Sequence, residues 1–327
     1  MAWVTWRQHR LTLAGIAALI GAAGLYLLIT GLQMRGAYSS VAACQPANSP
    51  LCQRAAGEFL DAYAPGAGWF LGLMQVIPAL IGAFAGAPLL ARELETGTFR
   101  YAWTQGFGRA RWAVAKLVPL AVAVTVSTGA FSALIAWYLQ PIFSAGDDKG
   151  PLDPTVFDMV GLALAAWTLV AFAIGVLAGF LIRRVIPAVF ATLAVWSALA
   201  VVTGFFLRGH YAAPLVTTSP SNPAQAWVLS QGWFHGGAPA SLDMINNTLA
   251  RVDVRAVTPE LFQPGPATPA NLGDPVNYLI QHGYTQLTTY QPVGRFWPFQ
   301  LVEGGWLLAL SVLLIATAVW LVSRRAA

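Results

Sequence analysis

The sequence predicts an all-α membrane protein with six transmembrane helices, both chain ends in the cytoplasm, and a large extracellular segment between the fifth and sixth spans. The composition, six long apolar stretches and the distribution of Lys and Arg predict this fold class. Hydrophobic residues make up 57% of the 327 residues and charged residues only 9%, whereas soluble domains carry about a quarter charged residues. We therefore expect a multi-pass protein of the inner (plasma) membrane, embedded in the lipid bilayer.

Six apolar stretches are long enough to cross the hydrocarbon core of a bilayer, which needs about 20 residues. None of them holds a Lys or Arg in its middle. Helices are expected in all of them, because lipid cannot satisfy open backbone groups. The expected spans are residues 11–32, 69–90, 117–140, 157–182, 185–207 and 302–322.

The basic residues predict the orientation. If the N-terminus lies inside, most Lys and Arg fall in the inner segments. The Lys and Arg on the outer side then lie mostly in long loops, which the positive-inside rule counts weakly. We therefore expect both ends of the chain inside. The basic residues of the inner segments are then Arg7, Arg10, Arg92, Arg100, Arg109, Arg111, Lys116, Arg183, Arg184, Arg324 and Arg325.

The segment before the first span has the pattern of an interfacial amphipathic helix over residues 1–10. Trp3 and Trp6 share one helical face there, and the cations lie mostly elsewhere. An ordinary aromatic and basic flank of a span is the alternative. A signal peptide fits residues 11–32 less well, because its apolar region is about 7–15 residues long and its cleavage site follows closely.

Cys44 and Cys52 are the only cysteines, and both fall in the first outer loop. A close pair outside the cell can oxidise, so we expect a small disulfide loop, with two free thiols as the alternative. No set of metal ligands at recognisable spacing is visible, since zinc needs about four.

Glu93 and Glu95 are the only acids that this orientation places in the cytoplasm, on a surface that is otherwise basic. They follow the second span. Helical propensity continues through residues 91–104, and Gly106-Phe107-Gly108 indicates a turn. We expect a short helix in the interface, a reversal, and re-entry at residues 109–116.

The stretch Glu93-Leu94-Glu95-Thr96-Gly97-Thr98 resembles an E-x-E-x-G-T-like stretch of the permease subunits of ABC-2-type exporters. The layout of interfacial helix, six spans and charged tail resembles that family as well, and residues 86–93 and 294–300 resemble an actinobacterial-type branch. The resemblance implies a coupling helix over residues 91–105 that docks on an ATPase. The implied ATPase-coupling residues are Glu93, Glu95, Gly97, Thr98 and Arg100.

The same resemblance implies the partners. A separate ABC ATPase, the nucleotide-binding subunit, would bind ATP and Mg, so no cofactor is expected in this chain. A second copy of the chain would complete the pathway as a homodimer, and no nucleic acid is expected. The sequence holds no phosphate-binding G-x-x-x-x-G-K-[ST], no H-E-x-x-H and no G-x-S-x-G. We therefore expect that the chain is not itself an enzyme.

The segment over residues 208–301 divides the membrane part, residues 11–207, from the last span and tail, residues 302–327. A loop of this length is usually functional or disordered. Its Trp, Tyr and Phe residues and its balanced charge argue against disorder, so we expect a folded extracellular cap. Helices are predicted over residues 242–250 and 276–282 within it.

The spans themselves contain small-residue spacings that allow close helix packing, namely Gly68/Gly72, Gly82/Gly86 and Gly175/Gly179. Which helices meet is not predictable from these spacings. Polar or helix-loosening residues could also mark a wall that moves, although Pro and Gly are frequent in membrane helices in any case. The candidates for translocation or gating are Gln75, Pro78, Thr125, Thr128 and Pro187.

Asp158 and Glu303 lie near the outer boundary, where a partnered or hydrated acid is the favoured interpretation. The sequence thus predicts the permease subunit of an ATP-driven exporter for an amphipathic or hydrophobic substrate such as a drug, antibiotic, peptide or lipid-like molecule. The alternative is a membrane sensing or assembly component whose cap binds a ligand. A membrane-embedded enzyme would need a convergent polar cluster, which the sequence does not indicate.

Overall fold

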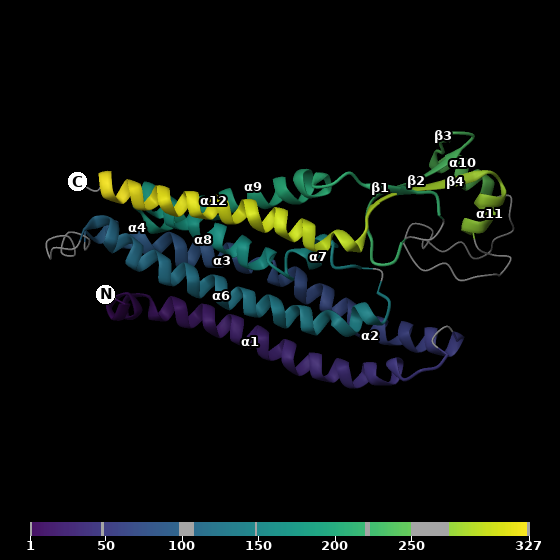
Figure 1. Ribbon diagram of the computed structural model, residues 1–327, viewed down its shortest axis with the longest axis horizontal. Helices are drawn as coiled ribbons and strands as arrows, with labels where there is room; N and C mark the ends of the chain where they lie inside the picture. Colours follow the sequence, from purple (N-terminus) through teal and green to yellow (C-terminus); the bar gives the residue numbers. More distant parts are fainter. Residues whose placement is uncertain are drawn as a thin grey trace.

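The computed structural model is a long helical bundle with a small β-sheet at one end (Figure 1). It describes residues 2–46, 49–97, 108–147, 149–219, 223–249 and 275–325. Both chain ends lie at the end of the bundle away from the sheet (Figure 1). We call these two ends of the molecule the terminal end and the sheet end.

Six helical segments of the described chain are long and apolar enough to cross a membrane, which confirms the expected number. Most of them are longer than the apolar stretches predicted from the sequence, because helix continues into the flanking polar residues. The six segments are Ala17–Ala42, Pro50–Thr96, Arg109–Ser144, Ala163–Ile182, Val185–His210 and Val293–Arg324.

The first span belongs to the helix α1 (Ala2–Ala42), which runs without interruption from the second residue. The second span is built in pieces, and its pieces are α2 (Pro50–Met74), α3 (Ile77–Ile81), the π-helix η1 (Gly82–Gly86) and α4 (Ala87–Thr96). The remaining spans consist of α6 (Arg109–Ser144), α8 (Ala163–Ile182), α9 (Val185–Val202) with η2 (Thr203–Leu207) and η3 (Arg208–His210), and α12 (Phe296–Arg325).

The connection between α1 and α2 is shorter than the sequence predicted. The side chain of Ser49 accepts a hydrogen bond from the backbone N–H of Cys52, and Pro50 opens the helix. A side-chain acceptor before the helix and a proline in its first turn both favour a helix start there. Cys52 therefore lies in the first turn of α2 rather than in a loop. It is joined to Cys44 by a disulfide, with 5.6 Å between the Cα atoms.

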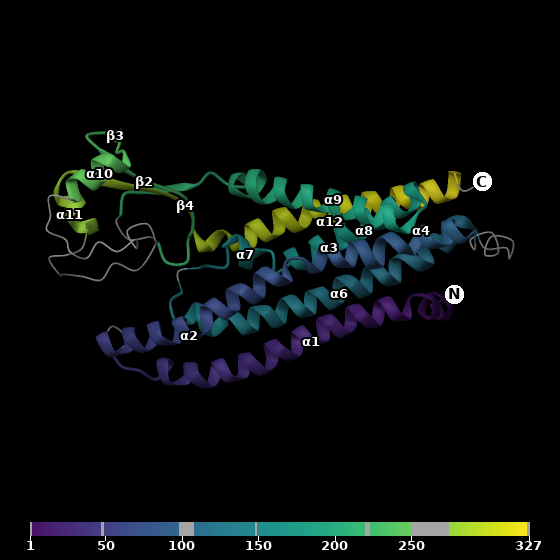
Figure 2. The same cartoon turned by 180° about the vertical axis from the view of Figure 1, so that it is seen from behind.

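The helix α8 lies at the centre of the bundle and contacts α3, η1, α4, α6, α9 and α12. It is nearly all apolar and largely buried, as expected for a helix surrounded by others. On one side of the bundle α1 lies next to α6, whereas α9 and α12 lie along the opposite side (Figures 1 and 2).

Two of the small-residue spacings meet each other in this core. A Cβ atom on Gly82 would come 2.5 Å from the carbonyl oxygen of Ala171, and one on Gly86 would come 2.6 Å from that of Phe172. Gly175 and Gly179 of α8 face Gly82 and Ala87 just as closely. The backbones of the second span and α8 therefore touch, as small residues allow in membrane helices. Cβ atoms on the third pair, Gly68 and Gly72, would meet nothing within 4 Å.

The sheet end carries a four-stranded antiparallel sheet in the order β1-β4-β2-β3. Its strands are β1 (Leu215–Thr217), β2 (Trp227–His235), β3 (Ala238–Pro239) and β4 (Tyr284–Gln291). The helices α10 (Leu242–Leu249) and α11 (Pro275–Gln281) correspond to the two helices predicted for this segment. The sheet was not predicted, so the all-α fold class applies to the spans and not to the whole chain.

A small core joins this sheet to its helices. Ile245 and Leu249 of α10, Leu279 of α11 and Tyr284 of β4 are all at most 6% exposed and form one cluster. The short helix α7 (Pro154–Phe157) comes between α6 and α8 in the chain, contacts α2 and lies toward the sheet end of the bundle (Figure 1).

Candidate functional site

We call the stretch Glu93-Leu94-Glu95-Thr96-Gly97-Thr98 the glutamate motif. Its glutamates lie at the terminal end, in the last turns of α4. The helix ends at Thr96, and Gly97 follows with φ +71°, in the left-handed region. Glycine reaches that conformation without the steric penalty that other residues carry. Gly97 therefore fixes the direction in which the chain leaves α4. Thr98 and Arg100 lie outside the described residues.

Glu93 points into the bundle. It is 7% exposed and forms a buried ion pair with Lys116 of α6, which is 6% exposed. The ammonium nitrogen of Lys116 also lies 4.6 Å from the centre of the Trp112 ring, within the range of a cation–π contact. Apolar side chains of α4, α6, α8 and α12 pack beside this pair. Glu93 is therefore part of the contact between α4 and α6.

Glu95 is exposed and contacts a different helix. Its carboxylate accepts a hydrogen bond of 3.2 Å from the backbone N–H of Val185, the first residue of α9. A carboxylate at this position is favourable because the first N–H groups of a helix have no partner within the helix and carry partial positive charge. The two glutamates of one motif thus connect α4 to α6 and to α9.

Two of the gating candidates lie at an interruption of the second span. Gln75 ends α2, and Pro78 is buried near the start of α3. The Gln75 side-chain amide donates to the backbone oxygen of Thr155 over 3.4 Å. The π-helical turn Gly82–Gly86 follows, and such turns are frequent at functional sites. Gln75 and Pro78 also line one cavity together.

The other gating candidates have local roles in the structure. Thr125 and Thr128 donate to the backbone oxygens of Ala121 and Val124 within α6, a pattern in which the hydroxyl is satisfied by its own helix. Pro187 is exposed in the first turn of α9, where the missing N–H costs nothing. None of the three lines a described cavity, and their gating role stays a prediction.

A cluster of buried charges lies at the sheet end, and Arg208 is its centre. The Arg208 guanidinium donates to both carboxylate oxygens of Glu303, over 2.9 Å and 2.6 Å, and it also forms an ion pair with Asp158. Arg208 is 1% exposed and Glu303 is fully buried. A planar guanidinium suits this arrangement because its five N–H groups can serve two carboxylates at once. The interpretation of Asp158 and Glu303 as partnered boundary acids is confirmed.

Aromatic side chains complete the coordination of Glu303. The indole N–H of Trp167 donates to one carboxylate oxygen over 2.9 Å, and the Tyr211 hydroxyl donates to the other over 3.1 Å. The Trp306 indole in turn donates to the Tyr211 hydroxyl. The buried carboxylate is therefore surrounded by donors, which offsets the cost of removing it from water.

Gln300, one turn before Glu303 on α12, organises the start of α8. Its side-chain oxygen accepts from the backbone N–H groups of Leu162 and Ala163, both over 2.8 Å. Its amide nitrogen donates to the backbone oxygens of Phe157 and Val160. The residues around Asp158 are thereby fixed in position against α12.

The charges of this cluster do not balance. One guanidinium faces two carboxylates, so the fully ionised cluster has a net charge of −1. Burial raises the pKa of the Asp158 carboxyl to about 6, although the neighbouring Arg208 acts in the opposite direction. Burial, followed by the charge of Glu303, also raises the pKa of the Tyr211 hydroxyl. The side chain of Asp158 is 28% exposed and is the accessible member of the cluster.

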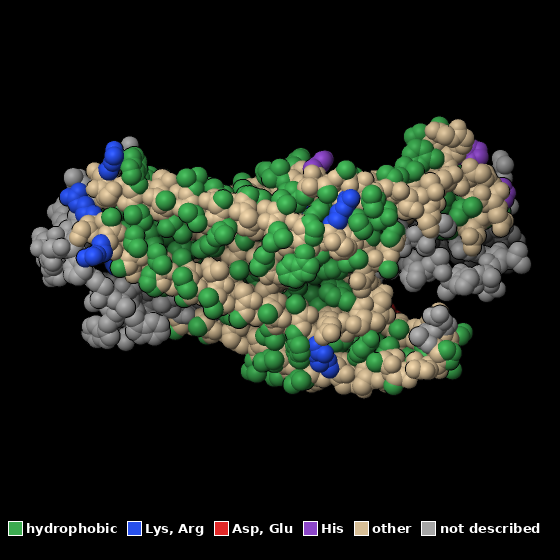
Figure 3. Space-filling view, viewed as in Figure 1, with side chains coloured by type: hydrophobic (Ala, Val, Ile, Leu, Met, Phe, Trp, Pro, Cys, Tyr) green, Lys and Arg blue, Asp and Glu red, His purple; other side chains and the backbone are tan. Residues whose placement is uncertain are grey.

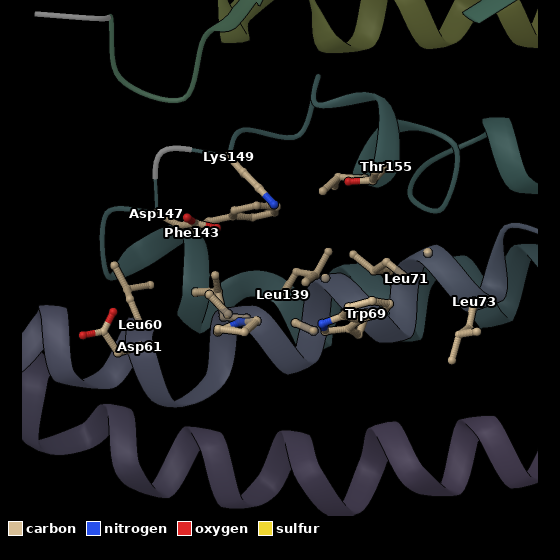
Figure 4. A pocket seen from close by; sticks show the side chains of 17 residues that line it. Leu60, Asp61, Trp69, Leu71, Leu73, Leu139, Phe143, Asp147, Lys149 and Thr155 are labelled. Carbon is tan, nitrogen blue, oxygen red and sulfur yellow. The ribbon is translucent and has the colours of Figure 1, made fainter. Parts of the chain in front are cut away.

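We distinguish two cavities at the sheet end, of which one is lined by members of this cluster. The larger, about 820 Å³, lies between α2, the end of α6 and the segment that leads to α7. Figure 4 shows Lys149 and Thr155 across this cavity from Trp69 and Leu71 of α2. The other, about 550 Å³, is lined by Gln75, Pro78, Asp158 and Arg208 together with apolar and aromatic side chains. We call it the Asp158 cavity.

The arrangement of spans, buried charges and cavities defines a multi-pass helical membrane protein. A family model described as ABC-2 membrane transporter related matches residues 16–208, more than half of the chain. The chain belongs to this family, as the resemblance in the glutamate motif predicted. No curated protein and no solved structure matches the chain. The matched region ends at Arg208 and therefore covers the first five spans but neither the sheet nor α12.

Sequence reasoning did not foresee the partners of the charged residues. It placed Arg208 in the outer loop and Lys116 on the inner surface, whereas both are buried in ion pairs. The sequence did contain a signal for these ion pairs. It is a basic residue directly at the end of one apolar stretch together with an unmatched acid at the same depth in another stretch. Intramembrane charges of this kind usually pair with one another.

Proposed function

We propose that this chain is the transmembrane permease subunit of an ATP-driven ABC-2-type exporter, which moves an amphipathic or hydrophobic substrate out of the cell. The observation that carries the proposal is the family match over the first five spans. Permeases of this family work with an ATPase subunit. ATP and Mg would be bound by that separate subunit, so the permease chain itself needs no cofactor.

The terminal end is proposed as the cytoplasmic side of the inner membrane. Basic side chains gather at this end of the molecule (Figure 3), as the positive-inside rule requires of short cytoplasmic connections. The disulfide between Cys44 and Cys52 lies at the opposite end of α1, and disulfides persist on the oxidising side of the membrane. In this orientation the sheet and its helices form an extracellular cap.

The glutamate motif is proposed as the site at which the ATPase acts on the spans. The geometry supports this because a displacement of the end of α4 would be resisted by the pair with Lys116 and by the Glu95 contact with α9. The coupling surface would then include residues 91–105, with Gly97 setting its direction. Glu95 is exposed to a partner, whereas Glu93 would act through α6.

A second copy of the chain is proposed to complete the pathway as a homodimer. The fifth span supports this, because only 11% of the residues in its most apolar stretch are buried within one chain. Large apolar side chains such as Ile186, Phe190 and Phe205 are exposed along it. These side chains need lipid or another protein surface against them.

Co-purification tests the proposal. The tagged chain, isolated from membranes of its native host, is expected to bring with it a protein that hydrolyses ATP, whereas an equally tagged unrelated membrane protein is not. Glu95→Gln should lower ATP hydrolysis by the complex, and Asp61→Asn, an exposed acid at the sheet end, should not. Recovery of the chain with no ATP-hydrolysing partner would contradict the exporter function.

A sensing or assembly component is the second candidate, and the folded sheet with its own core favours it. In that case the cap would bind a ligand and the spans would transmit the signal. The same co-purification separates the two functions, because a sensor of this kind needs no ATPase whose turnover depends on the chain.

A further inference from the structure

The Asp158 cavity lies where the second span, α7, the end of the fifth span and β2 come together. Its volume of about 550 Å³ falls within the range of cavities that hold drug-sized molecules, about 300–1,000 Å³. Gln75 and Pro78 enter it from the second span, Phe205 from η2 and Trp227 from β2. The cavity is therefore shared between segments that are far apart in the sequence.

The charge that this cavity presents is negative. Among the described residues that line it, Asp158 and Arg208 are the charged ones. The Arg208 side chain is 2% exposed and already serves two carboxylates, whereas the Asp158 side chain is 28% exposed. Glu303 and Tyr211 are the other titratable groups of the cluster, and neither lines the cavity. Glu303 accepts hydrogen bonds from Arg208 and from the Tyr211 hydroxyl. Both oxygens of the Asp158 carboxylate accept hydrogen bonds from Arg208. A molecule in the cavity would therefore meet the exposed part of this paired carboxylate, in a cluster whose net charge is −1.

The remaining walls are aromatic and aliphatic. Trp167 and Trp196 lie edge to face with their ring centres 5.9 Å apart, and both line the cavity together with Trp227 and Phe205. Tryptophan rings attract organic cations through their faces, and such sites recognise quaternary ammonium groups. The indole N–H of Trp196 has no hydrogen-bond partner in the described structure, so nothing polar holds this ring in place.

We propose that the Asp158 cavity binds a lipophilic organic cation, with the carboxylate of Asp158 as its counter-ion and the tryptophans as its walls. This inference rests on the proposed transport function for its biological meaning, and it names the substrate class of that function. A neutral or anionic amphiphile would fit the walls equally well but would leave the net negative charge of the cluster uncompensated. Charge is therefore the property that the site selects.

The test uses the purified full chain in dodecyl maltoside micelles, which carry no ammonium group, with empty micelles as background. The probes are tetraphenylphosphonium and tetraphenylborate, which have the same shape and opposite charge. Saturable binding of the cation and none of the anion is expected. Cation affinity should fall as the pH is lowered through about 6, because burial raises the Asp158 pKa to that value and protonation removes the counter-ion.

Matched variants locate the site. Asp158→Asn keeps the Arg208 pair with Glu303 and should weaken tetraphenylphosphonium binding about tenfold, whereas Asp61→Asn should not change it. Trp196→Leu should weaken binding and Trp196→Phe should preserve it. The phenylalanine variant breaks no described hydrogen bond, so a failure to fold is not expected to obscure this second comparison. Equal binding of both probes, or unchanged cation affinity in Asp158→Asn and Trp196→Leu, would overturn the proposal.

Added phosphatidylcholine distinguishes two sources of such a cation. Competition with tetraphenylphosphonium would identify a lipid headgroup as the natural occupant, and no competition would identify a dissolved substrate; either result supports the cation site. The measurement needs no ATPase. A failure of this inference is therefore separable from a failure of the exporter function, which the co-purification decides.

Discussion

The buried pair of Glu93 and Lys116 allows a direct test of what the glutamate motif does. Its two side chains are 9% and 7% exposed, too little for solvent to compensate either charge alone. Removing one partner of a buried pair typically costs about 3–5 kcal/mol, because the other charge is left uncompensated, whereas replacing both with apolar groups of similar volume is often neutral. Lys116→Met should therefore lower the stability of the purified chain by about 3 kcal/mol.

The double variant Glu93→Leu/Lys116→Met is the matched comparison, and it should recover most of that loss. Thermal unfolding in detergent, followed by intrinsic fluorescence at neutral pH, measures all of the variants under one condition. Arg92→Ala serves as the control because Arg92 is exposed, and such surface changes usually stay within about 0.5 kcal/mol. The reasoning is refuted if Lys116→Met unfolds at the temperature of the unmodified chain, or if the double variant is less stable than the single one.

Four further predictions concern other parts of the chain. Intact-mass analysis after alkylation should show no modified cysteine before reduction and two after it, and ready alkylation of the unreduced chain would contradict the Cys44–Cys52 pairing. Removing this disulfide should lower the stability of the chain by roughly 2–3 kcal/mol in the chain-entropy model. Arg208→Lys should destabilise the chain nearly as much as Arg208→Gln in thermal unfolding, because an ammonium cannot serve both carboxylates as the guanidinium fork does. The pKa of Asp158 is about 6 in the folded chain against 3.8 for the free side chain. Between these pH values the folded chain binds more protons than the unfolded chain, so its free energy of unfolding should fall as the pH rises from about 4 to 6. Asp158→Asn should flatten that slope. Gly175→Leu should abolish recovery of folded chain because its Cβ would overlap backbone atoms of the second span, whereas Gly72→Leu, where a Cβ meets nothing within 4 Å, should be tolerated; size-exclusion profiles distinguish the two.

The spans were predictable from the sequence because lipid imposes a requirement that each segment meets alone. A stretch such as residues 163–182 is apolar along its whole length, and length and hydropathy suffice to place it. The two helices of the cap were predictable for a similar reason, since their caps and apolar spacing are local. Helix ends were less predictable, because residues 33–42 and 50–68 are polar enough to resemble loop yet continue α1 and α2.

The sheet and the charged cluster depend on residues that are far apart in the sequence. Strand β2 pairs with β4, so that Trp233 lies opposite Gln286 across a long intervening segment. Arg208 meets Asp158 and Glu303, which are 50 and 95 positions away. A short run of β-branched and aromatic residues does not reveal its partner strand, and an arginine beside an apolar stretch does not reveal which acid lies at its depth. Only the packing of the helices decides these contacts.

The fifth span is the element that relates the two ends of the molecule. At its first residue the backbone N–H of Val185 donates to Glu95, and at its last turn Arg208 is bound to Asp158 and Glu303. Between these contacts the span is largely exposed and packs on α8, α4 and η1. Asp158 belongs both to the second of these contacts and to the wall of the cavity, so a shift of Arg208 would change the charge that the cavity presents. The two ends of the bundle are therefore connected through one helix, and the same arginine that stabilises α12 also sets the electrostatics of the proposed cation site.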